Sequence, residues 1–587
     1  MFTKTPWPGY VPVAVSLGLG LGLAAGLATA QLSPPTEGTK VNLNGREYVM
    51  AWSQGVNPQG QPTFGISDAG LANRFGFNLL STSNPQVQPV EWFNGSSQAL
   101  TVRWSPNGMF RYLDISAIAQ QQAWQVQPQG DTLQIKTPPA QVLGFRQGQQ
   151  PWGTRWVIDV SRPTPWQISR LTNSRTGLTP REFALTVEAS QVASEPIPNI
   201  KVTTAPTRTI WETSLSGTTR PQVSMLVNPP RIVVDFRNDP PPPRTIQWAP
   251  GLAWQEETIS LRSGQFPLNS LILDPKQPNL SLRPIWPSPN TLIGIQPLPE
   301  LAQRWQVAGA INGGFFNRDK QMPLGAIRSQ GQWISGPILN RGAIGWTEQG
   351  QIKVGRLALR QTLTTATGAK VNVTDLNSGF LQPGLALYTP AWGPRYSAQT
   401  SNETIFTVQN KQISNRQVAG GQAWVIPTDG YLLVWRGTGP LPETLTPGQT
   451  VELQTTPLPS DFDAFPNILG AGPLLIDGGK IVLDAAIEQF GRGLDAQSAP
   501  RSAIIQMPDG KIRLVTTHNR LGGSGPTLPE WAAILLQLGA TQALNLDGGS
   551  STNLYLGGRL IDRHSVTTTR VANGIGIFFK PPQNLSN

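Results

Sequence analysis

The sequence predicts β-rich N-terminal modules followed by an α+β domain, in which a mixed sheet carries few helices. Short apolar runs recur along the chain and end at turns, and glycine and proline supply 60 and 55 of the 587 residues. Residues 132–136 alternate polar and apolar side chains with the period of a half-buried strand. Only the segment around residue 530 combines a helical period with a helix cap. The chain is therefore mainly β at first and α+β afterwards.

Residues 1–30 have the pattern of a secretory signal peptide. Lys4 supplies the positive start, residues 13–27 are mostly apolar, and Ala28-Thr29-Ala30 forms a small-residue cleavage site. The alternative is an uncleaved anchor in which residues 13–30 tether the chain to a membrane, although a permanent span needs roughly 20 apolar residues. The chain has no cysteine, which is compatible with a bacterial periplasm or cell surface. We expect an exported protein.

The composition excludes some partners and favours others. The chain is long enough for several domains, because one core rarely grows beyond about 250–300 residues. The net charge is +11, but the arginines are scattered and form no basic block, so we expect no nucleic acid as a partner. A basic surface on an exported protein suits an anionic glycan, a phosphodiester or a membrane surface.

Two β-rich modules are expected at residues 31–98 and 99–244. The first is weakly similar to amine-oxidase-type N-terminal domains, with a plain structural β-domain as the alternative. In the second, residues 154–163 and 230–240 look like diverged copies, since each runs from arginine through an apolar strand to aspartate, arginine and proline. This resembles AMIN-type domains, which attach exported enzymes to the cell wall; two buried strands closed by turns are the alternative. Four prolines at 240–243 form a stiff spacer at the next boundary.

The third domain is expected at residues 245–582. Its predicted helix begins with a capping box between Thr527 and Glu530 and ends at Gly539. One apolar face follows the helical period, at Leu528, Trp531, Leu535 and Leu538. Asp-Gly turns predict hairpins near residues 477 and 509. We expect residues 362–456 to be a sheet extension or an insertion.

Three segments of this domain place polar residues at the ends of apolar strands. Residues 310–317 reach Asn312, Gly313 and Gly314, and residues 500–505 begin with Pro500, Arg501 and Ser502. Residues 543–553 end an apolar run in a turn that contains Asn545, Asp547, Gly548, Gly549, Ser550 and Ser551. Glycines let backbone approach a ligand, and exposed amides in such a turn attract anions. For the last segment, a tight Asp-Gly hairpin is the alternative.

These three segments, in this order, resemble the phosphodiester glycosidase family. The resemblance covers about the last 330 residues, and three ordered motifs are more specific than any one of them. The lysosomal member of the family removes N-acetylglucosamine from mannose-6-phosphate tags, and bacterial relatives are often associated with exopolysaccharide metabolism. The resemblance implies a sugar-1-phosphodiester substrate. The expelled phosphate is already a good leaving group, so the enzyme must mainly grip the phosphate and stabilise a positively charged sugar.

The resemblance implies roles for these residues. Asp547 is the candidate base, nucleophile or charge stabiliser. Arg501 is the first choice for the phosphate, because a guanidinium donates two parallel hydrogen bonds, and Arg341 is the second; Arg328 follows them. Asn312 and Asn545 bind sugar hydroxyls or fix the acid. The remaining substrate-binding residues permit close approach or donate to phosphate oxygens, and they are Gly313, Gly314, Gly548, Gly549, Ser550 and Ser551.

Both histidines are catalytic candidates, and for His518 a merely polar loop residue is the alternative. His518 lies ahead of the predicted helix, where the family has a glycine–arginine turn; here asparagine precedes Arg520, which weakens the transfer of a role to that arginine. His564 lies a short hairpin beyond Asp547. Two histidines without HExxH spacing make no standard zinc site, so we expect no metal and no required cofactor. Calcium or magnesium at Asp547 is the alternative.

We therefore expect an exported cell-envelope hydrolase that cleaves a sugar-1-phosphodiester, of an N-acetylglucosamine-like sugar or of an exopolysaccharide or wall component. Its N-terminal modules would bind peptidoglycan or exopolysaccharide. The rival hypothesis is a non-catalytic glycan- or peptidoglycan-binding envelope protein on the same fold. If the enzyme hypothesis holds, Asn312, Arg501 and Asp547 should lie at one site.

Overall fold

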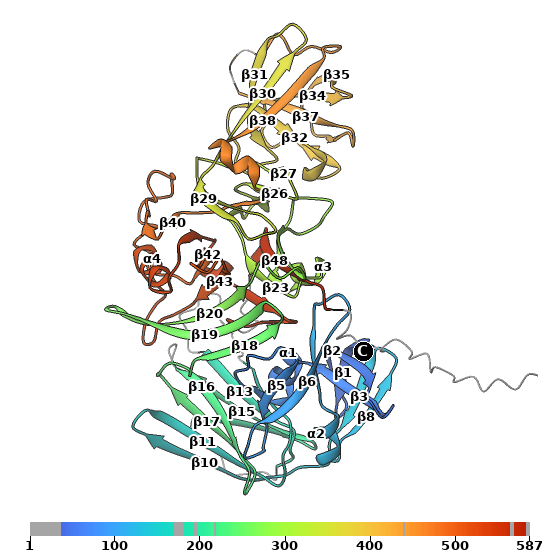
Figure 1. The fold of residues 1–587 in the computed structure, drawn as a ribbon, viewed down its shortest axis with the longest axis vertical. Coiled ribbons are helices and arrows are strands. Elements are labelled where there is room, and N and C mark those ends of the chain that lie inside the picture. Colours follow the sequence, from blue (N-terminus) through green and yellow to red (C-terminus); the bar gives the residue numbers. More distant parts are fainter. Residues whose placement is uncertain are drawn as a thin grey trace, which may run out of the picture.

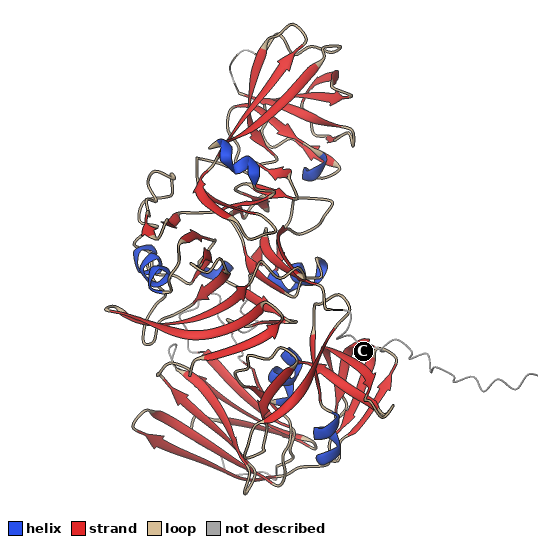
Figure 2. Cartoon of the chain, in the orientation of Figure 1, coloured by secondary structure: helices blue, strands red, loops and turns tan. Residues whose placement is uncertain are grey.

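The computed structural model describes residues 37–169, 181–191, 197–215, 219–437, 439, 441–563 and 569–582. The expected signal peptide, residues 1–30, and His564 lie outside the described residues. Strands dominate and helices are few (Figure 2), which confirms the predicted fold class. Among the described helices, none has the length and hydropathy needed to cross a membrane.

The first module is one nine-stranded sheet, in the order β4-β5-β6-β7-β3-β2-β1-β9-β8. Its strands are β1 (Glu37–Leu43), β2 (Arg46–Val56), β3 (Pro62–Ser67), β4 (Asn78–Leu79), β5 (Val87–Glu91), β6 (Gln98–Trp104), β7 (Arg111–Asp114), β8 (Gln125–Gln129) and β9 (Thr132–Lys136). It also holds α1 (Asp68–Gly70), a π-helical turn (Leu71–Phe75) and α2 (Ser116–Gln121). The boundary expected at residue 98 is wrong, because β6 to β9 complete this sheet: β1 pairs in parallel with β9, Lys40 opposite Thr132.

The second module consists of two four-stranded sheets, in the orders β10-β11-β17-β16 and β12-β13-β15-β14. Their strands are β10 (Val142–Gln150), β11 (Gly153–Val160), β12 (Trp166–Ser169), β13 (Arg181–Val187), β14 (Lys201–Ala205), β15 (Arg208–Leu215), β16 (Arg220–Leu226) and β17 (Arg231–Arg237). The two repeated segments are β11 and β17, and they pair antiparallel with each other. Arg155 therefore lies opposite Asp235, with Nε and Oδ1 2.7 Å apart, and Arg231 lies opposite Asp159. The repeated arginine and aspartate are cross-strand ion pairs.

The third domain is built on an eight-stranded sheet, in the order β18-β19-β20-β43-β42-β44-β40-β41. Its strands are β18 (Arg244–Ala249), β19 (Leu252–Leu261), β20 (Gly264–Leu273), β40 (Leu474–Asp477), β41 (Lys480–Ile481), β42 (Arg501–Gln506), β43 (Ile512–Thr517) and β44 (Gln542–Asn545). Strands from the two ends of the domain lie side by side here, green next to red in Figure 1. Helix α4 (Leu528–Gln537) packs on one face, and Thr527 and Glu530 form the predicted capping box.

Two five-stranded sheets lie next to this sheet, in the orders β21-β48-β23-β45-β46 and β27-β26-β39-β28-β29. Their strands are β21 (Leu280–Ile285), β23 (Gly309–Asn312), β26 (Ile327–Ser329), β27 (Gln332–Ser335), β28 (Gly342–Trp346), β29 (Ile352–Arg356), β39 (Asn467–Gly470), β45 (Leu554–Leu556), β46 (Arg559–Leu560) and β48 (Gly574–Phe579). The smaller elements are α3 (Leu298–Arg304), the pairs β22 (Gln296–Pro297) with β47 (Arg570–Val571) and β24 (Phe316–Asn317) with β25 (Met322–Pro323), and 3-10 turns at Ser460–Ala464 and Gly549–Ser551.

The expected extension or insertion is an insertion with a core of its own. It forms a seven-stranded sheet, in the order β35-β34-β37-β32-β31-β30-β38, at the top of Figure 1. Its strands are β30 (Ala358–Thr365), β31 (Lys370–Leu376), β32 (Gly384–Tyr388), β34 (Glu403–Gln409), β35 (Gln412–Val418), β37 (Gly430–Arg436) and β38 (Val451–Leu458), joined by the pair β33 (Arg395–Ser397) with β36 (Ala423–Val425) and a 3-10 turn at Pro390–Trp392.

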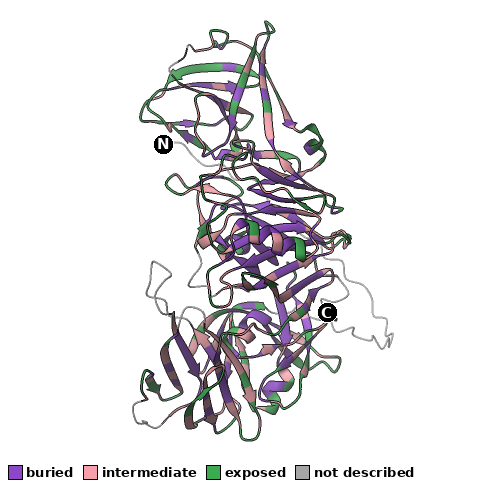
Figure 3. Ribbon diagram, turned by 90° about the vertical axis from the view of Figure 1, so that its left-hand side faces the viewer, coloured by how far each residue is buried: buried purple, intermediate pink, exposed green. Residues whose placement is uncertain are grey.

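The molecule is elongated, with the two N-terminal modules at the opposite end from the insertion (Figure 1). Buried residues are concentrated in the third domain between these ends (Figure 3). The first module is fixed to β18 by buried groups: the Trp248 Nε1–H donates to Asp68 Oδ2 at 2.9 Å, and Asp68 also lies 3.6 Å from Arg111. The second module contacts the segment after β43, because Arg220 Nη2 donates to Asn519 O at 3.2 Å. The N-terminal modules thus rest on the edge of the eight-stranded sheet and also reach the residues that follow β43.

Candidate functional site

The three motifs meet where β23, β42 and β44 end or begin. Three backbone hydrogen bonds join them: the Asp547 N–H donates to Gly313 O at 2.9 Å, Leu546 to Ser502 O at 2.9 Å, and Gly549 to Pro500 O at 2.8 Å. A side-chain hydrogen bond joins β23 to β42, because Ser502 Oγ donates to Asn312 Oδ1 across 190 residues of sequence. The turn around Asp547 is therefore clamped between the other two motifs.

Asn312 is the hub of this arrangement. Its side chain is fully buried, and its Nδ2 donates to the Asp547 carbonyl at 2.7 Å. Its Oδ1 accepts from the Ser502 hydroxyl at 2.7 Å and from the Asn553 N–H at 3.1 Å. Of the two roles expected for Asn312, these contacts fit the one in which it fixes the loop of the acid.

Replacing Asn312 by alanine should lower the free energy of unfolding by about 2–4 kcal/mol, because three buried polar groups lose their partner at once. Chemical denaturation of wild type and variant measures this loss. The matched control is Asn372→Ala on β31, at an exposed strand position, which should change stability by less than about 0.5 kcal/mol. Equal stability of the two variants would show that Asn312 does not hold the motifs together.

Asp547 is half-buried at the head of the turn. Burial is the main influence on its carboxyl group and raises its pKa to about 6. The Ser551 hydroxyl, the Gly548 N–H at 3.0 Å from Oδ1, and Arg318 act in the opposite direction on this pKa. Ser551 Oγ is near enough to influence the carboxylate without forming a hydrogen bond of normal geometry. Asp547 is thus ionised at neutral pH, although burial destabilises its charged form.

Arg501 is a buried cation beside the same turn. Only 4% of its surface is exposed, its Nε donates to Pro526 O at 3.2 Å, and its Nη2 donates to the Gln497 carbonyl. A methyl group added at Gly548 would lie 3.7 Å from Nη1. Within the described residues Arg501 forms no ion pair, and burial lowers its pKa to about 10. A desolvated guanidinium with only carbonyl partners is suited to an anionic ligand.

The turn also holds buried polar atoms without partners. Within the described residues, Asn545 Oδ1, Ser551 Oγ and Thr552 Oγ1 have no hydrogen-bond partner, although Asn545 Nδ2 donates to Gly472 O at 2.8 Å. Buried polar atoms are nearly always paired in folded proteins. Three such atoms in eight consecutive residues around Asp547 indicate a place for polar atoms of a ligand or of water.

His518 lies at the same end of the sheet as Arg501, one residue beyond Thr517, which pairs with Arg501. Its Nε2 lies 3.0 Å from Oδ2 of Asp562, a carboxylate whose side chain is fully buried. The neighbouring Arg563 donates to the carbonyls of Ser550 and Thr552 at 3.0 and 3.1 Å. The segment that contains Asp562 and Arg563 thus links His518 to the Asp547 turn.

Two arginines expected to bind phosphate have other partners. Arg341 donates to the carbonyls of Glu488 and Gln489 and stacks on Phe490, 4.0 Å from its ring centre. Phe490 in turn lies beside Gly472, so Arg341 is one layer away from the Asp547 turn. Burial lowers the Arg341 pKa, against the effect of Glu488. Arg328 forms an ion pair with Asp463 at 3.1 Å, which is a structural role.

The glycines serve the packing of the backbone more than the approach of a ligand. An added Cβ at Gly313 would collide with Asn573 Oδ1, and one at Gly548 would lie 2.8 Å from Pro500 O. Gly549 differs, because its φ is +62° and the space beside it is open. Of the four candidate glycines, Gly549, next to the exposed Ser550, is the one that leaves room for a substrate.

Sequence reasoning missed several residues of the site. Ser502, Asn553 and Asn573 hold the motifs together, and Arg318 acts on the Asp547 carboxylate. Ser502 was visible as the neighbour of Arg501, and Arg318 as a charged residue shortly after Gly314. Asp562 had no such signal, because its partner His518 lies 44 residues earlier in the chain.

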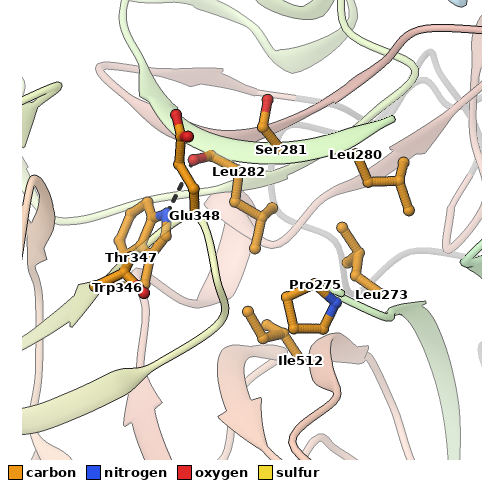
Figure 4. Close-up of a pocket in the computed structure, with 9 residues that line it drawn as sticks. All are labelled: Leu273, Pro275, Leu280, Ser281, Leu282, Trp346, Thr347, Glu348 and Ile512. Atoms are coloured by element: carbon orange, nitrogen blue, oxygen red, sulfur yellow. Dashed lines mark hydrogen bonds between the residues drawn. The ribbon is translucent and has the colours of Figure 1, made fainter. Parts of the chain in front are cut away.

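A small cavity between β20, β21 and β28 is not the site (Figure 4). Its volume is about 20 Å³, room for about one water molecule, and its walls are mainly apolar. The Trp346 Nε1–H donates to Leu282 O at 2.9 Å in its wall, and it contains no residue of the three motifs. Within the described residues, no three His, Asp or Glu side chains are grouped as metal ligands.

Comparison with known proteins gives one family. The model of the phosphodiester glycosidase family matches residues 402–578, which include Arg501, His518 and Asp547 but not Asn312. A hypothetical protein from Synechocystis of known crystal structure is 42% identical, with a TM-score of 0.87, over 92% of this chain and 99% of that chain. No curated protein gives a significant match.

Two other solved structures are more distant. A protein from Burkholderia pseudomallei K96243 is 18% identical with a TM-score of 0.46, over 75% of this chain and 100% of that chain. The catalytic domain of zebrafish N-acetylglucosamine-1-phosphodiester alpha-N-acetylglucosaminidase, auto-inhibited by its pro-peptide, is 13% identical with a TM-score of 0.30, over 57% of this chain and 85% of that chain. With TM-scores of 0.46 and 0.30, neither structure is close enough for its geometry to be transferred to this chain.

Proposed function

Because this chain belongs to the phosphodiester glycosidase family, we propose that it hydrolyses the bond between the anomeric carbon of a sugar and a phosphodiester. The observation that carries the proposal is the meeting of the three motifs: an ionised, half-buried Asp547 lies in a turn against which the buried Arg501 packs. The cation Arg501 and the anion Asp547 lie at neighbouring strand ends. Together they suit a substrate that carries a phosphate and develops positive charge on its sugar.

Each group has a task in this reaction. Arg501 holds the phosphate, with the exposed Ser550 and the open backbone of Gly549 beside it. The phosphate monoester leaves without much help from an acid, since it is a stable anion. Asp547 stabilises the positive charge that develops at the anomeric carbon, and a site of low dielectric strengthens this effect. Asn312 keeps the acid in place through the Asp547 carbonyl.

We also propose that the protein acts outside the cytoplasm, in the periplasm or on the cell surface. The signal-peptide pattern of residues 1–30 and the basic net charge of +11 support this location. In that setting the substrate is an N-acetylglucosamine-like sugar phosphate or part of an exopolysaccharide or wall polymer. The N-terminal modules, which contact β18 and Asn519, would offer a further surface for peptidoglycan or exopolysaccharide.

The purified full chain should release free sugar from a sugar-1-phosphodiester when a panel with different sugars and one common alcohol is assayed for reducing ends. The expected result is turnover on one sugar, with loss of release in Asp547→Asn. If no sugar in the panel is released faster than by that variant, while both proteins melt cooperatively, the enzyme proposal is wrong. In that case glycan binding by the same wild-type protein, measured by calorimetry, would favour the non-catalytic alternative.

A further inference from the structure

We propose that Asp562 is a positioning residue, which holds His518 so that its Nδ1 takes the proton of the attacking water. This inference rests on the proposed hydrolysis and assigns the proton acceptor within it. Asp562 belongs to none of the three motifs, and its carboxylate contacts His518 and the Leu554 N–H.

The geometry fixes the ring of His518 in one orientation. Asp562 Oδ2 lies 3.0 Å from Nε2, and Asp562 Oδ1 accepts the Leu554 N–H at 2.9 Å, so both carboxylate oxygens have defined partners. The Asp562 side chain has no exposed surface, whereas 24% of the His518 side chain is exposed. The carboxylate is therefore the fixed member of the pair, and the imidazole is the member that solvent and substrate can reach.

The carboxylate also selects the tautomer of the neutral imidazole. A carboxylate only accepts hydrogen bonds, so Nε2 must carry the ring proton and Nδ1 must carry the lone pair. Nδ1 has no hydrogen-bond partner within the described residues. A histidine that served only to join two segments would need one nitrogen alone, and here the second nitrogen stays available as a base.

His518 and Asp562 are attached to the strand ends that carry the site, and Arg563, next to Asp562, binds the Asp547 turn. His518 follows the strand residue that pairs with Arg501, and Arg563 holds the carbonyls of Ser550 and Thr552. The proton acceptor, the phosphate-binding arginine and the acid thus stand on neighbouring strand ends of one sheet. Such an arrangement separates the roles: Asp547 stays ionised beside the sugar while another group handles the proton.

The atoms of the step balance with these groups alone. The water oxygen bonds to the anomeric carbon as the bond from that carbon to the phosphate oxygen breaks, and the electron pair of the broken bond leaves with the phosphate. One water proton moves to His518 Nδ1. The ring becomes imidazolium with its Nε2–H still donated to Asp562, and the proton later passes to solvent.

The test is Asp562→Asn. The amide side chain of this variant can still accept the Leu554 N–H through its oxygen, but its nitrogen donates to Nε2 of His518 and forces the ring proton onto Nδ1. We expect kcat to fall about 10⁴-fold with KM changed less than about threefold, as for the wrong tautomer in a catalytic triad. Asp562→Glu, which remains an acceptor, should recover part of kcat. Asp509→Asn, on the exposed hairpin before β43, is the matched control and should keep wild-type kcat.

The tautomer is measured directly by nitrogen NMR of protein labelled at histidine. The chain has two histidines, and the ring signals that disappear in His518→Gln identify His518. We expect the Nε2–H form in the wild type and the Nδ1–H form in Asp562→Asn. A wild-type ring protonated on Nδ1, or an Asp562→Asn variant with wild-type kcat, overturns this proposal while the hydrolysis itself stands. Absence of hydrolysis by the wild type overturns the proposed function instead.

Discussion

Asp547→Asn should reduce the release of sugar from a sugar-1-phosphodiester about 10³-fold and, at neutral pH, make the protein more stable. The first effect follows from the loss of the negative charge that faces the developing positive charge of the sugar. The second follows from burial, which raises the pKa of Asp547 from 3.8 to about 6. A shift of about two pKa units corresponds to about 3 kcal/mol of stability.

The sign of the stability effect depends on pH. A carboxyl whose pKa is raised by folding binds its proton more tightly in the native state, so the wild type loses stability as pH rises from 3.8 to about 6. Asparagine carries no charge and keeps its acceptor oxygen for the Gly548 N–H. The variant should therefore unfold at higher denaturant concentration than the wild type at about pH 7.5, and the two midpoints should converge at about pH 4.

The activity of the wild type should follow the same ionisation. Because Asp547 must be charged, kcat/KM is expected to fall about tenfold for each pH unit below about 6. Equal stability of wild type and Asp547→Asn at neutral pH would show that burial of the charged carboxylate does not destabilise the folded protein. Retained activity in the variant would remove Asp547 from the reaction.

Arg501→Met should lower kcat/KM for a sugar-1-phosphodiester about 10²- to 10³-fold, mainly through loss of the charge that holds the phosphate. An uncharged aryl glycoside of the same sugar should suffer much less, because it has no phosphate for the guanidinium. The ratio of kcat/KM for the two substrates is the measurement. Arg501→Lys should recover only part of the loss, since lysine lacks the planar fork.

The control for Arg501→Met is Arg492→Met. Arg492 is exposed on the segment between β41 and β42, so its replacement removes the same charge without emptying a buried position. It should leave the ratio of the two substrates unchanged. If both variants shift the ratio equally, the effect is a general electrostatic attraction and Arg501 does not bind the phosphate.

Local features of the fold could be predicted from the sequence. The capping box of Thr527 and Glu530 and the Asp-Gly turns are settled by residues within one turn of each other, and the structure has them as predicted. The boundary at residue 98 could not be predicted, since it depends on β1 pairing with a strand about 90 residues later. Alternation of apolar residues identifies a strand but not its partner.

Some residues of the site could likewise be predicted from the sequence, and others could not. The motifs around Asn312, Arg501 and Asp547 are contiguous in sequence, and the structure places them in contact. Arg341 could not be separated from Arg501 by sequence alone, because its stacking on Phe490 depends on a segment nearly 150 residues away. Asp562 was missed because a carboxylate gains its role from the histidine it faces, and no local pattern marks that pair.

The pairing of β11 with β17 has a consequence for how the second module folds. Each of its two sheets takes two strands from residues 142–187 and two from residues 201–237, and the arginine of β11 or β17 meets the aspartate of the other strand. Neither half by itself completes a sheet or neutralises these charges. The two halves therefore depend on each other and form one cooperative folding unit.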